Sequence, residues 1–442
     1  MQTIESILCG DAVLTMNDGM DVVRHGAVAV DGGAVVAVGA QQEILSKYSS
    51  KTVLDGKGRV LLPGFVNTHC HAAMAYFRGL ADDMQLKEWL EQHIWPAENR
   101  LLSPEFVADS AELACLEMLK GGVTTVNDMY FFGAATALSA KKMGMRAIVG
   151  AGIVDFPTIA GNSVDEYLAK AEAFIREWSG DPLVSGAIAP HSAYACGPDT
   201  LKRVKEMADR LGCLIHLHVS ETAWEVGEIR SRFGRRPVEH LEAIGMLAPN
   251  VVAVHCVWLD DAEIEIFARR GVGVAHCIES NLKLASGFAP VAKMLKAGVN
   301  VSFGTDGAAS NNDLNMLGEL STAAKVHKAV AEDPTVLDAK TALRMATRGG
   351  AEVLGLGGSI GSLEPGKRAD IISFDMRKPH LSPLYDPYSH IVYAARPSDI
   401  DLVMVDGKIL VRNGVAIACS ETDILAKAEE WKKKISPDGA KI

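Results

Sequence analysis

The sequence predicts an α/β protein, a (β/α)8 TIM barrel with a small β-sandwich domain that both ends of the chain build. Two patterns support this fold class. The middle of the chain alternates short runs of β-forming residues with helical stretches of about ten residues or more, which is typical of repeated βα units. Both ends carry short strands separated by Gly and Asp turns. The length of 442 residues suits one barrel and a satellite better than several equal domains.

The two ends of the chain share one texture. The N-terminal part predicts short strands at residues 11–15, 27–30 and 35–38. The same pattern returns at residues 370–374 and 402–411. Because chain termini often lie close in space, we expect both ends to form one sandwich. The predicted domains are residues 1–60 for the first part of the sandwich, 61–367 for the barrel and 368–442 for the second part of the sandwich.

Eight β-rich runs lie between these ends. They cover residues 60–66, 123–126, 146–150, 184–189, 214–218, 251–255, 272–276 and 299–304. Segments 199–211 and 289–297 carry apolar residues at helical spacing, which indicates an outer layer of helices. Active sites of such barrels lie at the C-terminal ends of the strands, so polar residues at those ends are the candidates for a site.

Composition narrows the class of partner. The 44 basic and 55 acidic residues give a formal net charge of −11, which argues against nucleic acid and favours a small-molecule substrate. No segment approaches about 18 uninterrupted apolar residues, so we expect no membrane partner. Residues 1–5 lack the features of a secretory signal, and we therefore expect a cytoplasmic protein. The eight scattered cysteines favour neither a disulfide framework nor a thiolate zinc site.

Imidazoles and carboxylates follow five of the predicted strands. His69 and His71 are spaced i and i+2, which directs both side chains to one side of an extended chain. The other groups are His191 after the fourth run, His218 and Glu221 after the fifth, His255 after the sixth and Asp306 after the eighth. Because these positions share one end of the barrel, we expect them to converge on one pocket.

These residue types predict a metal site with one divalent ion per subunit. Imidazoles and a carboxylate without thiolates suit Zn²⁺, with Fe²⁺ or another first-row metal as the alternative. Taking His69, His71, His218 and Asp306 as ligands leaves an open position for water, whose pKa the metal lowers towards about 7. Glu221, three residues after His218, and His255, at the end of the next run, could both reach that water or the substrate. They are the candidate proton-transfer groups.

Each candidate has a structural alternative. His216 shares a face with His218 but lies deeper in the barrel, so we interpret it as a structural residue. For His276, after the seventh run, both interpretations stay open. Asp306 lies in Gly-Thr-Asp-Gly, where a turn aspartate is the alternative, and His191 gains a role in substrate contact only from the groups around it.

Six motifs, in this order along the chain, resemble the amidohydrolase superfamily. They are Pro-Gly-Phe-Val-Asn-Thr-His-Cys-His at 63–71, His-Leu-His-Val-Ser-Glu at 216–221, Val-His-Cys at 254–256, Ser-Asn-Leu-Lys-Leu at 280–284, Gly-Thr-Asp-Gly at 304–307 and Gly-Ser-Leu-Glu-Pro-Gly-Lys-Arg-Ala-Asp at 361–370. No lysine suited to carboxylation follows a strand, which resembles the mononuclear deaminase branch. Segments 88–100 and 189–196 are similar to the 5′-methylthioadenosine/S-adenosylhomocysteine deaminases.

The resemblance implies how a substrate is bound. Its metal ligands would be His69, His71, His218 and Asp306, as above. Glu98 would accept hydrogen bonds from the ribose hydroxyls, and His191 would contact the nucleoside. A homodimer or tetramer is common in the family, so a homo-oligomer is the expectation.

The resemblance also implies a hydrolytic deamination that yields an inosine analogue and ammonia. Glu221 would deliver a proton to N1 of the adenine. Asp306 would take a proton from the attacking water and pass it to the departing amine, while His255 would orient the nucleophile. Glu221 and Asp306 therefore belong to the substrate-binding set as well as to the catalytic set.

Two residues differ from the pattern of the family, and the first of them bears on the preferred substrate. Ala151 stands where some members carry an arginine for the homocysteine carboxylate, which favours methylthioadenosine over S-adenosylhomocysteine, and Ile278 stands where proline is common. Trp89 is a hypothetical lining residue of the pocket for the 5′ substituent.

An aminohydrolase acting on a free nucleobase or a triazine is one alternative function. Such an enzyme would not use Glu98, because its substrate has no ribose. A metal-free scaffold of the same fold is the other, but such proteins usually lack ligands that are present here.

Overall fold

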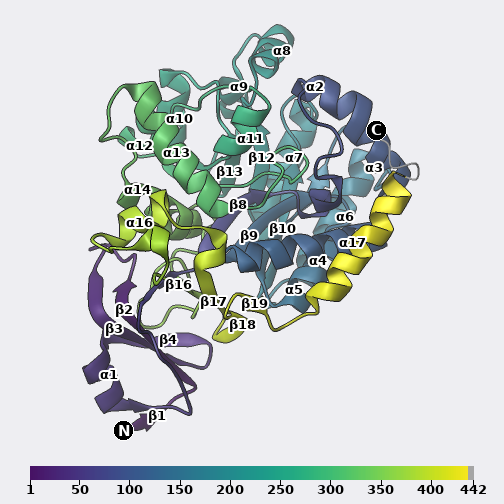
Figure 1. Cartoon of the computed structure of the whole chain (residues 1–442). Helices are drawn as coiled ribbons and strands as arrows, with labels where there is room; N and C mark the ends of the chain where they lie inside the picture. Colours follow the sequence, from purple (N-terminus) through teal and green to yellow (C-terminus); the bar gives the residue numbers. More distant parts are fainter. Residues whose placement is uncertain (437–442) are drawn as a thin grey trace. The chain divides into compact units, whose positions relative to one another are not determined.

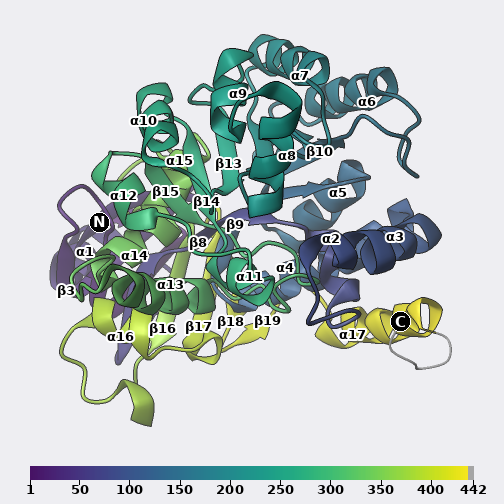
Figure 2. The ribbon, with the colours of Figure 1, turned by 90° about the horizontal axis from the view of Figure 1, so that it is seen from above.

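The computed structural model describes residues 1–436 and contains an eight-stranded parallel sheet whose strands follow one another in chain order (Figures 1 and 2). The strands are β8 (Phe65–Cys70), β9 (Val123–Tyr130), β10 (Arg146–Ile153), β11 (Val184–Pro190), β12 (Ile215–Val219), β13 (Val251–His255), β14 (Gly273–His276) and β15 (Asn300–Phe303). A parallel bridge joins Cys70, the last residue of β8, to Asp306 in the chain beyond β15 and brings the sheet near closure. The predicted barrel is confirmed.

The first predicted run is divided between two sheets. Strand β7 (Arg59–Pro63) pairs with β16 (Ile371–Asp375), whereas β8 begins at Phe65 in the barrel. Gly64 lies between them, and its N–H donates to the Asp370 carbonyl at 3.0 Å. A Cβ on Gly64 would lie 2.1 Å from Thr124, so only glycine fits where the chain changes sheets.

Helices follow the barrel strands and lie outside them (Figure 2). They include α4 (Pro104–Lys120), α5 (Gly133–Met143), α6 (Val164–Glu177), α7 (Pro198–Leu211), α8 (Ala223–Phe233), α9 (Pro237–Ala243), α10 (Asp261–Arg270), α11 (Ile278–Lys283) and α12 (Val291–Lys296). Helix α13 (Met316–Ala331) follows β15 in the chain. The two predicted helical segments are found as α7 and α12. Within residues 1–436, none of the helices combines the length and the apolar character that a membrane crossing requires.

The second large sheet joins the two ends of the chain. Its strands are β2 (Ser6–Leu14), β3 (Val22–Asp31), β4 (Ala34–Ala40), β6 (Thr52–Leu54), β7, β16, β17 (Ile400–Val405), β18 (Lys408–Arg412) and β19 (Val415–Ala416). Antiparallel pairing of β7 with β16 connects the N-terminal and C-terminal strands. A short pair, β1 (Gln2–Thr3) with β5 (Tyr48–Ser49), flanks α1 (Gln41–Lys47). The fold class predicted from the sequence is therefore confirmed.

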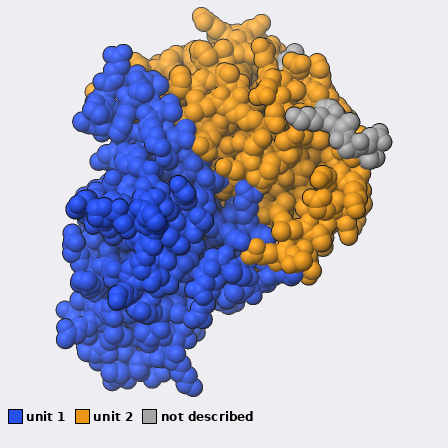
Figure 3. Space-filling view, in the orientation of Figure 1, with its two compact units in different colours: residues 1–66, 116–125, 315–420 blue, residues 67–115, 126–314, 421–442 orange. Residues whose placement is uncertain are grey.

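Contacts divide the chain into two compact units (Figure 3). The first comprises residues 1–66, 116–125 and 315–420, and the second comprises 67–115, 126–314 and the chain from 421 onward. The remaining helices are α2 (Leu86–Trp89), α3 (Trp95–Leu101), α14 (Ala339–Arg344), α15 (Gly350–Val353), α16 (Pro387–Tyr393) and α17 (Glu421–Ile435). Every predicted site residue lies in the second unit. The domain boundaries given by the sequence stay a prediction, because compact units and sheets need not coincide.

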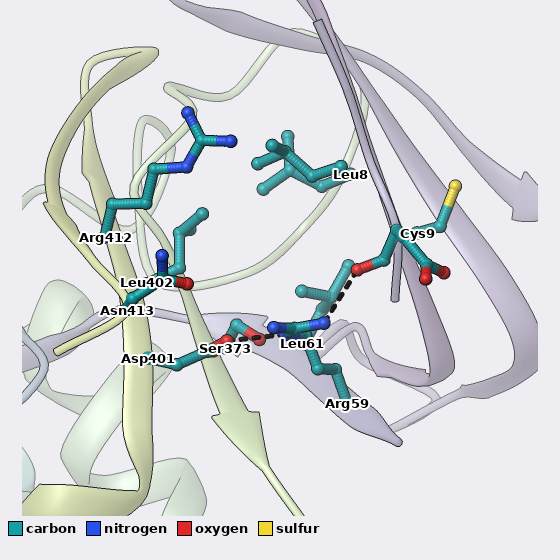
Figure 4. A pocket seen from close by; sticks show the side chains of 11 residues that line it. Leu8, Cys9, Arg59, Leu61, Ser373, Asp401, Leu402, Arg412 and Asn413 are labelled. Carbon is teal, nitrogen blue, oxygen red and sulfur yellow. Dashed lines mark hydrogen bonds and ion pairs between the residues drawn. The ribbon is translucent and has the colours of Figure 1, made fainter. Parts of the chain in front are cut away.

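A cavity of about 210 Å³ lies in the first unit (Figure 4). Leu8, Leu61 and Leu402 contribute apolar surface, and the ion pair between Arg59 and Asp401, 2.5 Å long, lies beside them. None of the predicted site residues lines this cavity. The predicted site is therefore built elsewhere, in the second unit.

Candidate active site

His69, in β8, lies at the centre of a cluster of imidazoles and a carboxylate. Its Nε2 is 3.2 Å from Asp306 Oδ1, and His71 Nε2 is 3.3 Å from the same oxygen. The ligand atoms of His69, His71 and Asp306 lie within 4.8 Å of one another, and so do those of His69, His218 and His255. The structure thus brings the four predicted metal ligands together, with His255 beside them.

Hydrogen bonds to backbone carbonyls orient two of the predicted histidine ligands. His71 Nδ1–H donates to the Met129 carbonyl at 2.5 Å, and His218 Nδ1–H donates to the His191 carbonyl at 2.8 Å. A histidine that ligates a metal through one nitrogen usually donates its other N–H in this way. The Nε2 atoms of both rings are therefore left to face a cation, and the donor set fits a divalent metal.

His216 supports the third histidine. Its Nε2 lies 2.9 Å from His69 Nδ1, and the side chain is fully buried. This contact fixes the orientation of the His69 ring and agrees with the structural interpretation of His216. His276 is also fully buried, and its ring lies 6.2 Å from that of Phe303, between centroids.

Burial favours the neutral form of two of the clustered imidazoles, His69 and His218. It lowers the pKa of His69 to about 3 and that of His218 well below its usual value. Burial alone would raise the pKa of Asp306, but the hydrogen bond with His69 and the surrounding imidazoles outweigh it and hold that pKa well below its usual value. Neutral imidazoles and an ionised carboxylate are the forms that ligate a metal.

The backbone and two hydroxyl groups fix the carboxylate of Asp306. The residue has φ +60°, in the left-handed region that aspartate tolerates better than most residues. Its Oδ2 accepts hydrogen bonds from the hydroxyls of Ser280 at 2.6 Å and Ser310 at 2.8 Å. The N–H of Gly307 donates to Oδ1 at 2.8 Å. The carboxylate is therefore held in place against the histidines.

Glu221 and His255 form a buried pair beside the cluster. Glu221 Oε2 lies 3.9 Å from His255 Nε2, and His255 Nδ1–H donates to Asn281 Oδ1 at 2.9 Å. Burial raises the pKa of Glu221, although His255 acts in the opposite direction. Burial alone would lower the pKa of His255, but Glu221 and Asp306 outweigh it and raise that pKa. A carboxyl group that retains its proton is suited to act as a general acid.

The loop that carries Glu221 is itself fixed by a carboxylate. Glu225, in α8, accepts hydrogen bonds from the backbone N–H groups of Ser220 and Glu221, at 2.9 and 2.8 Å. Glu225 is buried, which raises its pKa to about 7. This contact positions the Glu221 backbone directly after β12.

Glu98 is connected to the cluster through one tyrosine. The Tyr130 hydroxyl donates a short hydrogen bond to Glu98 Oε1, and the Tyr130 ring lies 6.2 Å from the His71 ring, between centroids. Burial raises the pKa of Glu98 to about 7, and the hydrogen bond from Tyr130 acts in the opposite direction. The tyrosine ring thus lies between the carboxylate predicted to bind ribose and His71, a predicted metal ligand.

His191 lies next to His218. The two ring centroids are 4.7 Å apart, and the ring of Tyr194 lies 5.6 Å from His191 on another side. Burial lowers the pKa of His191 to about 4, so the neutral ring can both donate and accept hydrogen bonds. This position is compatible with contact to a bound substrate.

Comparison with known families decides the relationship. The profile of the amidohydrolase family matches residues 60–410. The chain belongs to the amidohydrolase family. The resemblance drawn from the six motifs is confirmed, and so are the expected class of enzyme and the presence of a divalent metal site.

Individual relatives of this amidohydrolase cover nearly its whole length. A 5-methylthioadenosine/S-adenosylhomocysteine deaminase of Thermodesulfovibrio yellowstonii is 52% identical over 96% of this chain and 97% of its own. A 5′-deoxyadenosine deaminase of Methanosarcina acetivorans is 44% identical over 94% and 95%. The crystal structure of an adenosine deaminase from Xanthomonas campestris with bound zinc is 42% identical, with a TM-score of 0.97 over 99% of both chains.

The sequence missed several residues that this amidohydrolase uses to hold its site. Ser280 and Asn281 lie within the Ser-Asn-Leu-Lys-Leu motif, but the motif does not reveal that they contact Asp306 and His255. Tyr130 and Glu225 had no comparable signal. Their roles depend on contacts between segments far apart in the chain or on the path of one loop, which residue spacing does not report.

Proposed function

We propose that this amidohydrolase is a hydrolytic deaminase that converts 5′-methylthioadenosine and related 5′-modified adenosines to the inosine analogues and ammonia. The observation that carries the proposal is Glu98, a buried carboxylate that Tyr130 connects to the histidine cluster. A ribose diol can donate two hydrogen bonds to such a carboxylate, whereas a free base or a triazine offers no diol. The names of the relatives from Thermodesulfovibrio and Methanosarcina support the same class of substrate.

The proposed metal is one Zn²⁺ per chain, with His69, His71, His218 and Asp306 as its ligands. The zinc in the Xanthomonas structure supports this choice. When bound, a divalent metal lowers the pKa of a coordinated water towards about 7 and so supplies a nucleophile at neutral pH. The remaining chemistry belongs to side chains of the chain itself.

Three side chains move protons or orient groups in the proposed reaction. Glu221, whose burial favours the protonated form, gives its proton to N1, so that negative charge does not build up on the ring. Asp306 accepts one proton from the attacking water as the bond from C6 to oxygen forms, and transfers it to the amino group as the bond from C6 to nitrogen breaks. The second proton of the water returns to Glu221 as the C6 carbonyl forms. His255, paired with Glu221, donates a hydrogen bond that orients the nucleophile.

The proposed substrate can be tested by offering the protein a set of nucleosides and free bases and measuring ammonia release. Zinc-loaded protein should release ammonia from 5′-methylthioadenosine, with the ultraviolet shift from adenine to hypoxanthine. The same sample should leave free adenine, guanine and cytosine nearly untouched. Removal of the metal with a chelator should abolish release, and added Zn²⁺ should restore it, because no side chain replaces the nucleophile. Turnover of free bases alone would overturn the proposed substrate.

The second prediction concerns Tyr130→Phe and the pH dependence of nucleoside turnover. Glu98 must be ionised to accept two hydrogen bonds from a diol, and its pKa of about 7 means that the carboxylate prevails only above that pH. We therefore expect kcat/KM for 5′-methylthioadenosine to fall as the pH drops through about 7. The Tyr130 hydrogen bond lowers the pKa of Glu98, so Tyr130→Phe should move this decline to higher pH and raise KM.

A matched variant controls for the loss of a buried hydroxyl group. Tyr388 is 2% exposed, and its hydroxyl donates to the Met20 carbonyl at 3.0 Å within the first unit. Tyr388→Phe should leave the pH profile unchanged. An unshifted profile in Tyr130→Phe would show that Tyr130 does not set the ionisation of Glu98.

A further inference from the structure

An exposed aromatic pair lies in the second unit, one helical turn from Glu98. Trp95 is the first residue of α3, and Phe156 follows the end of β10. Their ring centroids lie 6.4 Å apart with the planes at 56°. Trp95 is 36% exposed and Phe156 is 44% exposed, although aromatic rings of this size usually bury more of their surface. The pair is therefore available to contact a ligand.

The position of the pair follows from contacts on both of its elements. Trp95 precedes Glu98 by three residues in one helix, so the two side chains share a face. The end of β10 lies beside Tyr130, since a Cβ on Gly152 would be 3.2 Å from the Tyr130 carbonyl oxygen. Helix α3 and the end of β10 thus both lie at the hydrogen bond between Glu98 and Tyr130, and the exposed pair is within a few residues of it on each of them.

The direction of a bound nucleoside follows from this order. If C6 of the base lies at the histidine cluster and the ribose diol at Glu98, the 5′ carbon is the end of the ligand farthest from C6. Glu98 is 8% exposed, whereas Trp95, one helical turn away, is 36% exposed, so the aromatic pair lies closer to solvent than the carboxylate does. The exposed pair is then the surface that the 5′ substituent reaches.

We propose that Trp95 and Phe156 form the wall that receives the 5′ substituent and that this wall selects small uncharged groups, such as methylthio, over a zwitterionic amino acid chain. The inference rests on the proposed function and deepens it. Apolar surface of the substituent is removed from water against the two rings, whereas the carboxylate of a zwitterion would lose hydration there and would gain no cationic partner from either ring. Ala151, half-buried on β10, adds no charge. Trp89, the tryptophan suggested by the sequence, is 4% exposed, and its Nε1–H donates to the Ala81 carbonyl at 3.1 Å.

The test compares 5′-methylthioadenosine, S-adenosylhomocysteine and adenosine on the zinc-loaded full chain. Wild type should prefer methylthioadenosine. In the double variant Trp95→Ala/Phe156→Ala, kcat/KM for methylthioadenosine should fall by about tenfold or more, which is the usual effect of lost apolar contact in a pocket. The loss should be in KM rather than kcat, because the wall does not touch the reacting atoms. The kcat/KM for S-adenosylhomocysteine should change by less than about threefold, which is well below the effect of losing one methylene contact.

A second variant tests the same wall by a gain of activity. Phe156→Arg places a guanidinium where the 5′ substituent ends, so the ratio of kcat/KM for S-adenosylhomocysteine to that for methylthioadenosine should rise about tenfold, as a charge-assisted contact predicts. As a control, Tyr385→Ala removes a ring that is 84% exposed in the first unit, and it should leave kcat/KM for both substrates unchanged.

The outcomes separate this inference from the proposed function. If wild type deaminates none of the three nucleosides, the proposed function fails. If wild type is active but the double variant and Phe156→Arg keep its ratio of substrates, only the aromatic wall is overturned. A shift of that ratio in Trp224→Ala alone, which alters a ring packed on Tyr194, would place the 5′ substituent on the other side of His191 and would also overturn it.

Discussion

Asp306→Asn should lower kcat/KM for 5′-methylthioadenosine by about 10³-fold or more, because one substitution removes the charged ligand of the proposed metal site and the group proposed to carry a proton to the amine. Asparagine has nearly the same shape, and its amide can still meet the hydroxyls of Ser280 and Ser310. We therefore expect the variant to fold. The measurement is steady-state deamination together with the zinc content of the purified protein, which should fall below that of wild type.

Ser310→Ala provides the matched comparison. It removes one of the two hydroxyl hydrogen bonds to Asp306 Oδ2 but keeps the carboxylate. The loss of one hydrogen bond to a charged group should lower kcat/KM by about 10- to 100-fold, which is less than the loss expected for Asp306→Asn. If Asp306→Asn kept activity within tenfold of wild type, Asp306 could be neither an essential ligand nor the proton carrier.

The geometry of the barrel explains why so much of this site was readable from sequence. Strand ends of a closed parallel sheet meet at one rim, so His69, His218, His255 and Asp306 could be grouped before any distance was known. His218 and His255 end their predicted runs, and His69 and Asp306 lie two or three residues beyond theirs. The motif at 304–307 also indicates an unusual backbone conformation, since Gly304 and Gly307 enclose Asp306, which adopts φ +60°.

Other features depend on contacts that periodicity does not report. The apolar run at 60–66 looks continuous, yet β7 and β8 belong to different sheets, because a change of partner strand leaves the alternation of residues unaltered. Tyr130 is the last residue of a fully buried strand, so nothing in the strand pattern distinguishes its hydroxyl contact with Glu98 from packing. The pairing of Trp95 with Phe156 joins the first turn of α3 to the loop after β10, and a contact between a helix and a distant loop leaves no period in the sequence.

The C-terminal helix shows the same limit on a larger scale. Helix α17 has an apolar face, as any surface helix does, and the sequence does not state which surface covers it. In the structure Trp431 packs on Phe106, with ring centroids 5.1 Å apart, and its Nε1–H donates to Asp109 at 3.0 Å. These partners belong to α4, which also follows β8 in the chain. An amphipathic pattern therefore predicts that a helix is covered, but not by what.

Glu221→Gln should separate proton transfer from metal binding, with a fall in kcat of about 10³-fold and little change in KM. Glutamine keeps the size of the side chain and can still donate a hydrogen bond to N1, but it cannot give up a proton. Zinc content should match wild type, in contrast to Asp306→Asn, because Glu221 is not among the proposed ligands.

The matched control is Glu228→Gln in helix α8, where Glu228 pairs with Arg232. This variant should behave as wild type. Binding of 5′-methylthioadenosine without turnover, measured by equilibrium dialysis, is the expected signature of the Glu221 variant. If the variant retained more than a tenth of wild-type kcat, another group would have to protonate N1, and His255, 3.9 Å from Glu221, would be the nearest candidate.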